Sequence, residues 1–383
     1  MADKKIKILY IIDYFHRTGG TEKHLAELIC HLPQERFENT VVVFDLGENA
    51  LIDAIRATGA SVIHMPVGRV YTPNAFLRMV ELRQIIREKG IDIVQTFAQK
   101  ADSYGAIAAK LSGVKRIVSS KRDTGEFRDS RYLFLNRLLG PLFDRVTVVS
   151  DAVANAAIAK EGFKREKIIK IYNGVDTVKF APPTIEEAVR ERHHWGFTAA
   201  DFVVGIVAGF RPEKNYDIFF SAVKRVLSEI CSLKILAVGG GPLLNYYRNY
   251  CANEGFSDRI VFAGDVANVA GCLKTMDMAC LISRSEGFSN AVVEKMAVGL
   301  PLVVTGVGGN KEAVVDGDNG IIIPPGDSDA VYESIVTLYA DPAMRRHMGR
   351  RSREIVEEKF SVKQMIRAYE QLYGELLSTR QKP

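Results

Sequence analysis

Short runs of Val and Ile alternate with longer stretches of helical periodicity along most of the chain. In the first half of the sequence these apolar runs lie at 6–12, 40–46, 61–65, 91–96, 116–120, 145–150 and 167–171. Strand-length runs separated by helical patterns are typical of βαβ units, which build a parallel sheet with helices on both faces. Functional loops of such a sheet follow the carboxyl ends of its strands.

The same alternation starts again in the second half. Its strand-like runs are 202–208, 233–238, 259–262, 278–282 and 301–304. The 383 residues exceed what one hydrophobic core usually supports. We therefore predict an α/β protein of two doubly wound parallel-sheet domains. Residues 1–178 form the first domain and 201–359 the second, with the proline-containing, charged segment 179–200 as linker.

The stretch 283–305 has the features of an anion-binding loop. Glu286 follows an apolar run, so it lies just past the carboxyl end of a strand. Ser289 or Asn290 can cap the helix that follows, and the first backbone N–H groups of that helix then point toward a ligand. Glu294 falls about one turn inside this helix. Two such carboxylates and free amides suit a ligand with phosphates and vicinal hydroxyls, although incidental acids on an amphipathic helix would give the same spacing.

The full motif is more specific than the two acids. The order Glu286-Gly-Phe-Ser-Asn-x-x-x-Glu294, followed by Lys-Met-Ala-Val-Gly-Leu-Pro, resembles the donor-site signature of retaining family 4 glycosyltransferases with the GT-B fold. By that resemblance two Rossmann-like domains face a central cleft, and the last helix, 360–383, crosses back to the first domain. The resemblance also implies that the donor sugar is held by Glu286, Gly287, Phe288, Ser289 and Asn290, and the ribose by Glu294.

Two cations follow the first strand of the second domain. Arg211 and Lys214 stand in the segment Gly209-Phe-Arg-Pro-Glu-Lys-Asn, where a forked guanidinium and a point charge can hold a diphosphate. Pro-Glu-Lys-Asn resembles the diphosphate motif of the family, but Arg211 stands two residues later than the usual arginine. Together with Glu286, these two residues are the predicted catalytic groups.

Glycine-rich turns after other strands complete the predicted donor site. Gly240 and Gly241 resemble the family turn beside the nucleotide, and Asp265 and Val266 resemble the turn that meets the base. In the first domain, Gly19 and Gly20 resemble the loop facing the diphosphate and the acceptor. None of these turns has the G-x-G-x-x-G spacing of a dinucleotide site.

The acceptor side departs from the family pattern. Many relatives place a histidine after the strand at 116–120, whereas this chain has Lys121, Arg122 and Asp123 there. We expect these three residues, with His16 from the first loop, to face the acceptor. The acceptor itself is expected to be a glycan or a lipid-linked molecule.

The segment 126–145 combines arginines with large apolar residues. Between Lys110 and Arg145 there are nine basic and four acidic residues. Their difference, +5, equals the net charge of the whole chain. A basic amphipathic helix can lie on an anionic membrane surface. It can equally pack its apolar side on the domain and leave its arginines in water, and both interpretations stay open.

Other function classes find little support. No apolar run reaches the length of a membrane-spanning helix, and no signal peptide is evident, so we expect a cytoplasmic protein. If the segment 126–145 binds the membrane, the protein also makes peripheral contact with its inner face. The modest charge and the motifs indicate no nucleic-acid partner. Five scattered cysteines show no zinc spacing. The D-x-D segments 316–318 and 327–329 are interpreted as turns, so we expect no metal and no cofactor.

These observations predict a metal-independent retaining glycosyltransferase that uses a nucleotide-diphosphate sugar, with UDP or GDP as nucleotide. Polysaccharide, lipopolysaccharide or glycolipid synthesis is the expected setting. Three alternatives remain: an epimerase or a phosphorylase of the same fold, and a non-catalytic protein that binds nucleotides or glycans.

Overall fold

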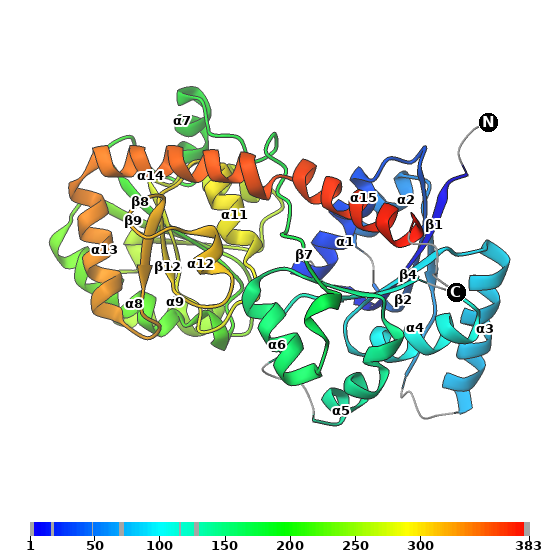
Figure 1. Cartoon of the computed structure of the whole chain (residues 1–383). Coiled ribbons are helices and arrows are strands. Elements are labelled where there is room, and N and C mark those ends of the chain that lie inside the picture. The colour runs from blue at the N-terminus through cyan, green and yellow to red at the C-terminus, as the bar shows by residue number, and fades with distance from the viewer. Residues whose placement is uncertain are drawn as a thin grey trace. The chain divides into compact units, whose positions relative to one another are not determined.

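The computed structural model describes residues 4–16, 19–47, 49–68, 73–114, 116–125 and 130–378. The chain forms two compact units (Figure 1). Unit 1 contains Met1–Gly174 together with Val362–Pro383, and unit 2 contains Val175–Ser361. The predicted linker, 179–200, lies within unit 2, where part of it forms a helix.

Unit 1 is built on a parallel sheet that has helices on both faces. Among its described residues, the strand order is β3-β2-β1-β4-β5-β6-β7. The strands are β1 (Ile6–Phe15), β2 (Phe37–Leu46), β3 (Ser61–His64), β4 (Ile93–Phe97), β5 (Arg116–Lys121), β6 (Arg145–Val148) and β7 (Ile168–Lys170). The helices are α1 (Gly20–His31), α2 (Ala50–Ala57), α3 (Pro73–Lys89), α4 (Gln99–Leu111), α5 (Ser130–Leu139), α6 (Asp151–Glu161) and α15 (Val362–Ser378).

Unit 2 repeats the design with the strand order β10-β9-β8-β11-β12-β13. Its strands are β8 (Phe202–Val207), β9 (Leu233–Val238), β10 (Ile260–Gly264), β11 (Met278–Leu281), β12 (Leu302–Thr305) and β13 (Gly320–Ile323). Its helices are α7 (Ile185–His194), α8 (Tyr216–Glu229), α9 (Leu244–Asn253), α10 (Val269–Leu273), α11 (Asn290–Ala297), α12 (Asn310–Ala313), α13 (Ser328–Ala340) and α14 (Pro342–Ile355), the last continuing into a π-helical turn at Val356–Phe360.

The strands are buried on both sides of the sheet and are mostly apolar. Every residue of β4 and of β8 is buried, as expected for parallel strands covered by helices on both faces. Local signals set the helix ends. Ser150 accepts a hydrogen bond from the Val153 amide at the start of α6, and Gly162 ends that helix in the left-handed conformation. The predicted class, two Rossmann-like α/β domains, is confirmed.

Helix α15 belongs to unit 1, although it follows unit 2 in the sequence. Its inner face includes Tyr369 and Tyr373, and both are completely buried in the core cluster of unit 1. The Tyr373 hydroxyl donates to the Gln95 side-chain oxygen at 2.6 Å and lies 3.3 Å from the Tyr10 hydroxyl. The chain thus passes twice between the units.

Both sheets have a switch point where the strand order reverses. In unit 1 it lies between β1 and β4, and in unit 2 between β8 and β11. In open parallel sheets, ligands bind outside the carboxyl ends of the strands at such points. The two switch points therefore locate the parts of each unit where the predicted site residues should be sought.

Candidate functional site

Unit 2 has an ion pair between two predicted catalytic residues at its switch point. The Lys214 ammonium, from the loop after β8, donates to Glu286 Oε1 at 2.6 Å, and Glu286 belongs to the loop after β11. The hydroxyl of buried Ser283 donates to the same oxygen at 2.6 Å. Two residues that the sequence predicts as catalytic thus lie in direct contact, although they are 72 positions apart.

Backbone and side-chain bonds hold these two loops together. The Arg284 amide donates to the Glu213 carbonyl at 2.8 Å, and the Arg284 guanidinium donates to the Asn215 side-chain oxygen at 3.0 Å. Asn215 has a left-handed backbone with φ of 56°, a conformation that Asn tolerates better than most residues. The Lys214–Glu286 pair is therefore fixed by the loops on which it stands.

A glycine turn after β12 packs against the Glu286 loop. A Cβ on Gly308 would lie 1.7 Å from the Glu286 carbonyl oxygen, and Gly308 has φ of 51°. The neighbouring Gly309 amide donates to the Gly287 carbonyl at 3.0 Å. Only glycine fits at 308, so this close approach helps to define the position of Glu286.

Helix α11 begins directly after this loop. Ser289 occupies the N-cap position, one of the two positions predicted for it, and its side chain makes no capping hydrogen bond. Asn290 is the first helical residue. The Phe288 ring is buried and packs on Phe360 with ring centroids 5.3 Å apart. Glu294 lies within the helix and is only 8% exposed.

The other predicted donor residues form a second group of loops in unit 2. The Gly240 amide donates to Asp265 Oδ1 at 2.7 Å, which joins the turns after β9 and β10. Gly241 has φ of 139° and packs against the Phe210 backbone, while Val266 is half-buried. Arg211 is exposed beside Gly209, and the described contacts do not connect its guanidinium to Glu286.

The D-x-D segments have structural partners. Asp316 accepts the Ile322 amide at 2.8 Å, and Asp318 faces the Arg351 guanidinium at 3.2 Å. Asp327 caps α13 by accepting the Ala330 amide at 2.9 Å. Asp316 and Asp327 thus serve a turn and a helix cap, whereas Asp318 and Asp329 form ion pairs with arginines.

In unit 1, the predicted glycine loop starts α1. Gly19 is the N-cap and Gly20 the first helical residue. A Cβ on Gly19 would lie 2.5 Å from a carboxylate oxygen of buried Glu22, so this helix end already faces a carboxylate. His16 is exposed, and its Nδ1 lies 3.4 Å from an Asp45 oxygen.

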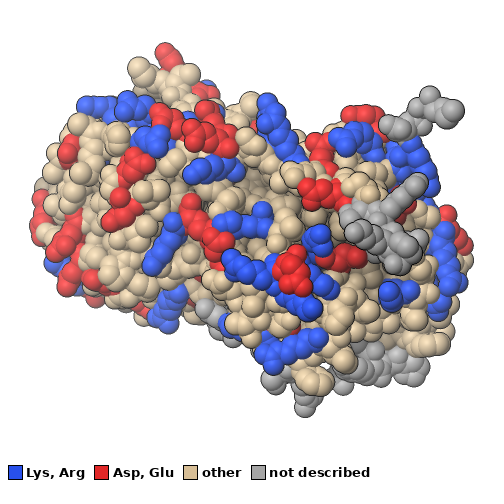
Figure 2. Space-filling model, in the orientation of Figure 1, with Lys and Arg blue, Asp and Glu red and all other residues tan. Residues whose placement is uncertain are grey.

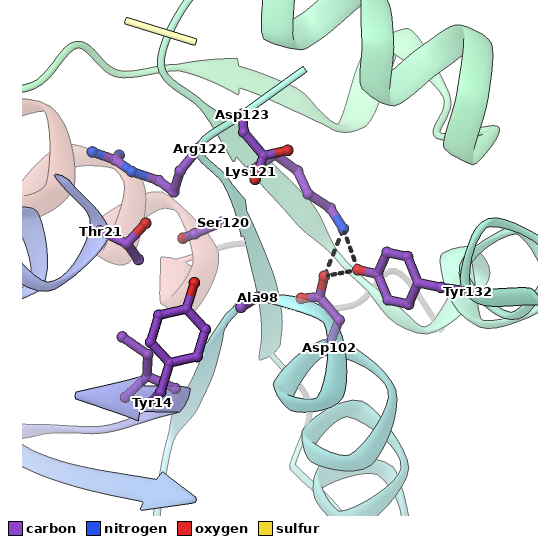
Figure 3. A pocket seen from close by; sticks show the side chains of 10 residues that line it. Tyr14, Thr21, Ala98, Asp102, Ser120, Lys121, Arg122, Asp123 and Tyr132 are labelled. Carbon is purple, nitrogen blue, oxygen red and sulfur yellow. Dashed lines mark hydrogen bonds and ion pairs between the residues drawn. The ribbon is translucent and has the colours of Figure 1, made fainter. Parts of the chain in front are cut away.

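A cavity of about 50 Å³ lies at the switch point of unit 1 (Figure 3). It is lined by the end of β1, the start of α4 and the end of β5. All three predicted acceptor-side residues after β5 are among its lining residues, which include Tyr14, Thr21, Asp102, Lys121, Arg122, Asp123 and Tyr132. The cavity exceeds the roughly 10–15 Å³ that it needs to hold one water molecule, so it has room for a hydroxyl group.

Lys121 forms the centre of a buried ion cluster in the wall of this cavity. Its ammonium donates to Asp102 at 2.5 Å and to the Tyr132 hydroxyl at 3.3 Å (Figure 3). It also donates to Glu161 at 2.6 Å. Lys121, Asp102 and Glu161 are each 3% exposed or less. An ammonium has three N–H groups, and all three are used here. The Asn136 side chain also donates to Glu161.

Two further charged groups adjoin the cavity. The Arg122 guanidinium extends away from the Lys121–Asp102 pair (Figure 3). It donates to the Asn173 side-chain oxygen. Burial lowers the pKa of Arg122 to about 10. Asp13, at the end of β1, accepts the amides of Lys100 and Ala101 at the start of α4, and burial raises its pKa to about 6 despite these bonds.

Helix α5 covers residues 130–139 of the segment 126–145, of which residues 126–129 lie outside the described residues. Two polar residues of its inner side, Tyr132 and Asn136, join the ion cluster, and buried Leu139 lies one turn further on. Phe134 and Leu138, one helical turn apart, are 72% and 66% exposed. The expectation that the apolar side faces inward therefore fails for these two residues.

On the face of the molecule shown in Figure 2, basic side chains are interspersed with acidic ones.

Several residues of the two sites were not predicted from the sequence. Ser283 lies in the stretch 283–305, yet nothing in its spacing indicates that it is a partner of Glu286. Asp102 and Glu161 lie on two different helices, and only packing brings them to Lys121. Lys295 is completely buried, and its ammonium donates to the Cys280 carbonyl at 3.2 Å. Burial lowers the pKa of Lys295 to about 8.

None of the helices in the described ranges has the combined length and apolar character that crossing a membrane requires.

Comparison with known proteins identifies the family. Residues 18–179 match the family described as Glycosyltransferase Family 4, and residues 201–341 match Glycosyl transferases group 1. A Bacillus anthracis N-acetyl-alpha-D-glucosaminyl L-malate synthase is 30% identical over 235 residues, or 61% of this chain and 60% of that protein. An Escherichia coli UDP-Gal:alpha-D-GlcNAc-diphosphoundecaprenol alpha-1,3-galactosyltransferase is 25% identical and covers 97% of this chain and 98% of its own.

Solved structures show the same fold. Anabaena HepE in complex with UDP superposes with a TM-score of 0.86 at 22% identity, over 97% of this chain and all of that one. The two family matches together span well over half of the sequence. The chain therefore belongs to the group 1 glycosyltransferases of family 4 and has their GT-B fold.

Proposed function

We propose that the protein is a retaining glycosyltransferase that takes a sugar from a nucleotide-diphosphate donor bound to unit 2. The observation that carries this proposal is the Lys214–Glu286 pair at the β8/β11 switch point, which brings a cation and a carboxylate together where ligands of such sheets bind. Relatives whose names specify UDP-Gal and GDP-mannose as donors support a nucleotide sugar.

The roles of the residues follow from their charges. When the donor sugar leaves its nucleotide, negative charge grows on the β-phosphate oxygen, and a fixed cation there lowers the barrier. Lys214 supplies that cation, with exposed Arg211 as a second one. Glu286 keeps the Ser283 hydroxyl bond when Lys214 turns to the phosphate, so its carboxylate stays positioned for the sugar. Glu294 is placed to bind the ribose hydroxyls.

We further propose that the acceptor offers a neutral hydroxyl to the unit 1 cavity. The Lys121 ammonium has no N–H group left for an acidic acceptor, because Asp102, Glu161 and Tyr132 take all three. The hydroxyls of Tyr14 and Thr21, also in the lining, suit a polyol. A glycan or the sugar of a lipid-linked precursor fits this chemistry, in cell-envelope polysaccharide or glycolipid synthesis.

Substitution at the pair tests the proposed donor role. We expect Glu286→Gln and Lys214→Met each to abolish sugar transfer, with the circular dichroism spectrum unchanged. The assay incubates the protein with UDP- and GDP-sugars and glycoside acceptors and analyses the products by mass spectrometry and NMR. Lys224→Met, which changes an exposed lysine on α8, is the matched control. Full activity in both site variants would contradict the assignment, and an isomerised donor without transfer would favour an epimerase instead.

A further inference from the structure

Lys295 is a buried cation that the proposed donor site does not yet use. Residues 292–297 of α11 are all buried, so the side chain cannot extend to water as surface lysines do. Its bond to the Cys280 carbonyl is the one hydrogen bond or ion pair of its ammonium within the described ranges. Burying a cation without a carboxylate partner destabilises a fold. A functional role for Lys295 would explain why the protein tolerates this loss of stability.

The position of Lys295 relates it to the loop that carries Glu286. Cys280 lies in β11, just before this loop, and Lys295 lies in α11, just after it. The hydrogen bond between them therefore closes the base of the loop from both ends. The ammonium is attracted electrostatically by Glu294 and Glu286 and repelled by Lys214.

The charge balance of the site depends on this group. Glu286 and Glu294 carry two negative charges, which Lys214 and exposed Arg211 only balance, so these four groups alone have no net attraction for a nucleoside diphosphate. The Lys295 ammonium makes the sum +1. Its charge acts strongly because it is buried, where water screens it little.

We propose that Lys295 is a positioning residue for the donor, whose buried charge fixes the Glu286 loop and offsets the two glutamates so that a diphosphate can bind. This inference rests on the proposed donor site.

The titration of Lys295 makes the role measurable. Cys280, Glu294, Lys214 and Glu286 are the charged and titratable groups that act on it. Because its pKa is about 8 in the folded protein, below its ordinary value, the ammonium loses its proton as the pH rises through 8. Nucleotide binding then weakens. Over the same range the fold becomes more stable, since the unfolded chain holds this proton more tightly than the folded one.

Calorimetric titration with UDP and with GDP tests the inference. We expect Lys295→Met and Lys295→Gln to bind the preferred nucleotide about tenfold more weakly, because a buried and weakly screened positive charge is lost. Both variants should melt at a higher temperature than the wild type without nucleotide. Wild-type affinity should fall between pH 7 and pH 9, roughly one pH unit either side of the pKa, and this fall should be absent from both variants. Lys224→Met is the control that should change neither quantity.

The outcomes separate the two proposals. If the wild type binds neither UDP nor GDP, the donor site itself is wrong, and this inference falls with it. If the wild type binds a nucleotide and Lys295→Met binds it equally well, the donor site stands and the inference is overturned. Wild-type affinity in Lys295→Gln alone would also overturn it, because a hydrogen bond and not the charge would then be responsible.

Discussion

Replacing Lys121 by Met should destabilise unit 1 strongly. The substitution keeps the length of the side chain but leaves the carboxylates of Asp102 and Glu161 buried without their shared cation. Removing one partner of a buried ion pair typically costs about 3–5 kcal/mol. For a unit of this size each kcal/mol lowers the melting temperature by about 2–4 °C, so we expect a decrease of about 6–20 °C.

Differential scanning calorimetry is the suitable assay, because two units can unfold in separate transitions. Lys164→Met is the matched control, since Lys164 lies in the same unit with its side chain 74% exposed. A triple variant, Lys121→Met with Asp102→Asn and Glu161→Gln, should recover much of the loss because it removes the unpaired charges. A melting temperature for Lys121→Met equal to that of Lys164→Met would refute this reasoning. If transfer were lost at unchanged stability, Lys121 would instead contact the acceptor.

Further predictions concern the Glu286 loop, α5 and metal ions. Gly308→Ala should cost roughly 1–3 kcal/mol of stability from backbone strain alone and displace the Glu286 backbone, lowering transfer, whereas Gly317→Ala, with a similar φ but open space around it, should keep its activity. Thermal melts and transfer assays of both variants check this. Replacing Phe134 and Leu138 by Ser should weaken sedimentation with vesicles of anionic phospholipid about tenfold, because two exposed apolar side chains are lost; equal sedimentation would exclude α5 as a membrane contact. EDTA should leave the transfer rate unchanged, and a rate that returns only with Mn²⁺ or Mg²⁺ would contradict a metal-independent reaction.

The sequence predicts those parts of the structure that depend on local patterns. The apolar runs locate the strands of both sheets, and the motif after β11 locates Glu286 and Glu294. Because strand ends meet at one edge of a parallel sheet, the loop with Lys214 could also be expected near Glu286. The run at 320–323, which forms β13, was not among the predicted strands. It is short and follows a glycine-rich turn, so its pattern does not distinguish a strand from a loop.

What the sequence did not predict depends on packing between distant segments. Lys121 meets partners 19 and 40 positions away, and no spacing rule connects them. The helical pattern around α5 suggested an apolar inner side, yet this side satisfies the ion cluster through Tyr132 and Asn136. A buried polar network of this kind overrides the pattern, since its groups need partners more than Phe134 needs burial.

The discontinuous course of unit 1 has a consequence for synthesis of the chain. Because α15 supplies Tyr369 and Tyr373 to the same core as the first strands, that core stays incomplete until α15 has left the ribosome. Unit 2, whose residues are contiguous, can acquire its native structure earlier. A chain truncated after Ser361 and released from the ribosome should therefore resist protease over unit 2 while unit 1 remains open to cleavage.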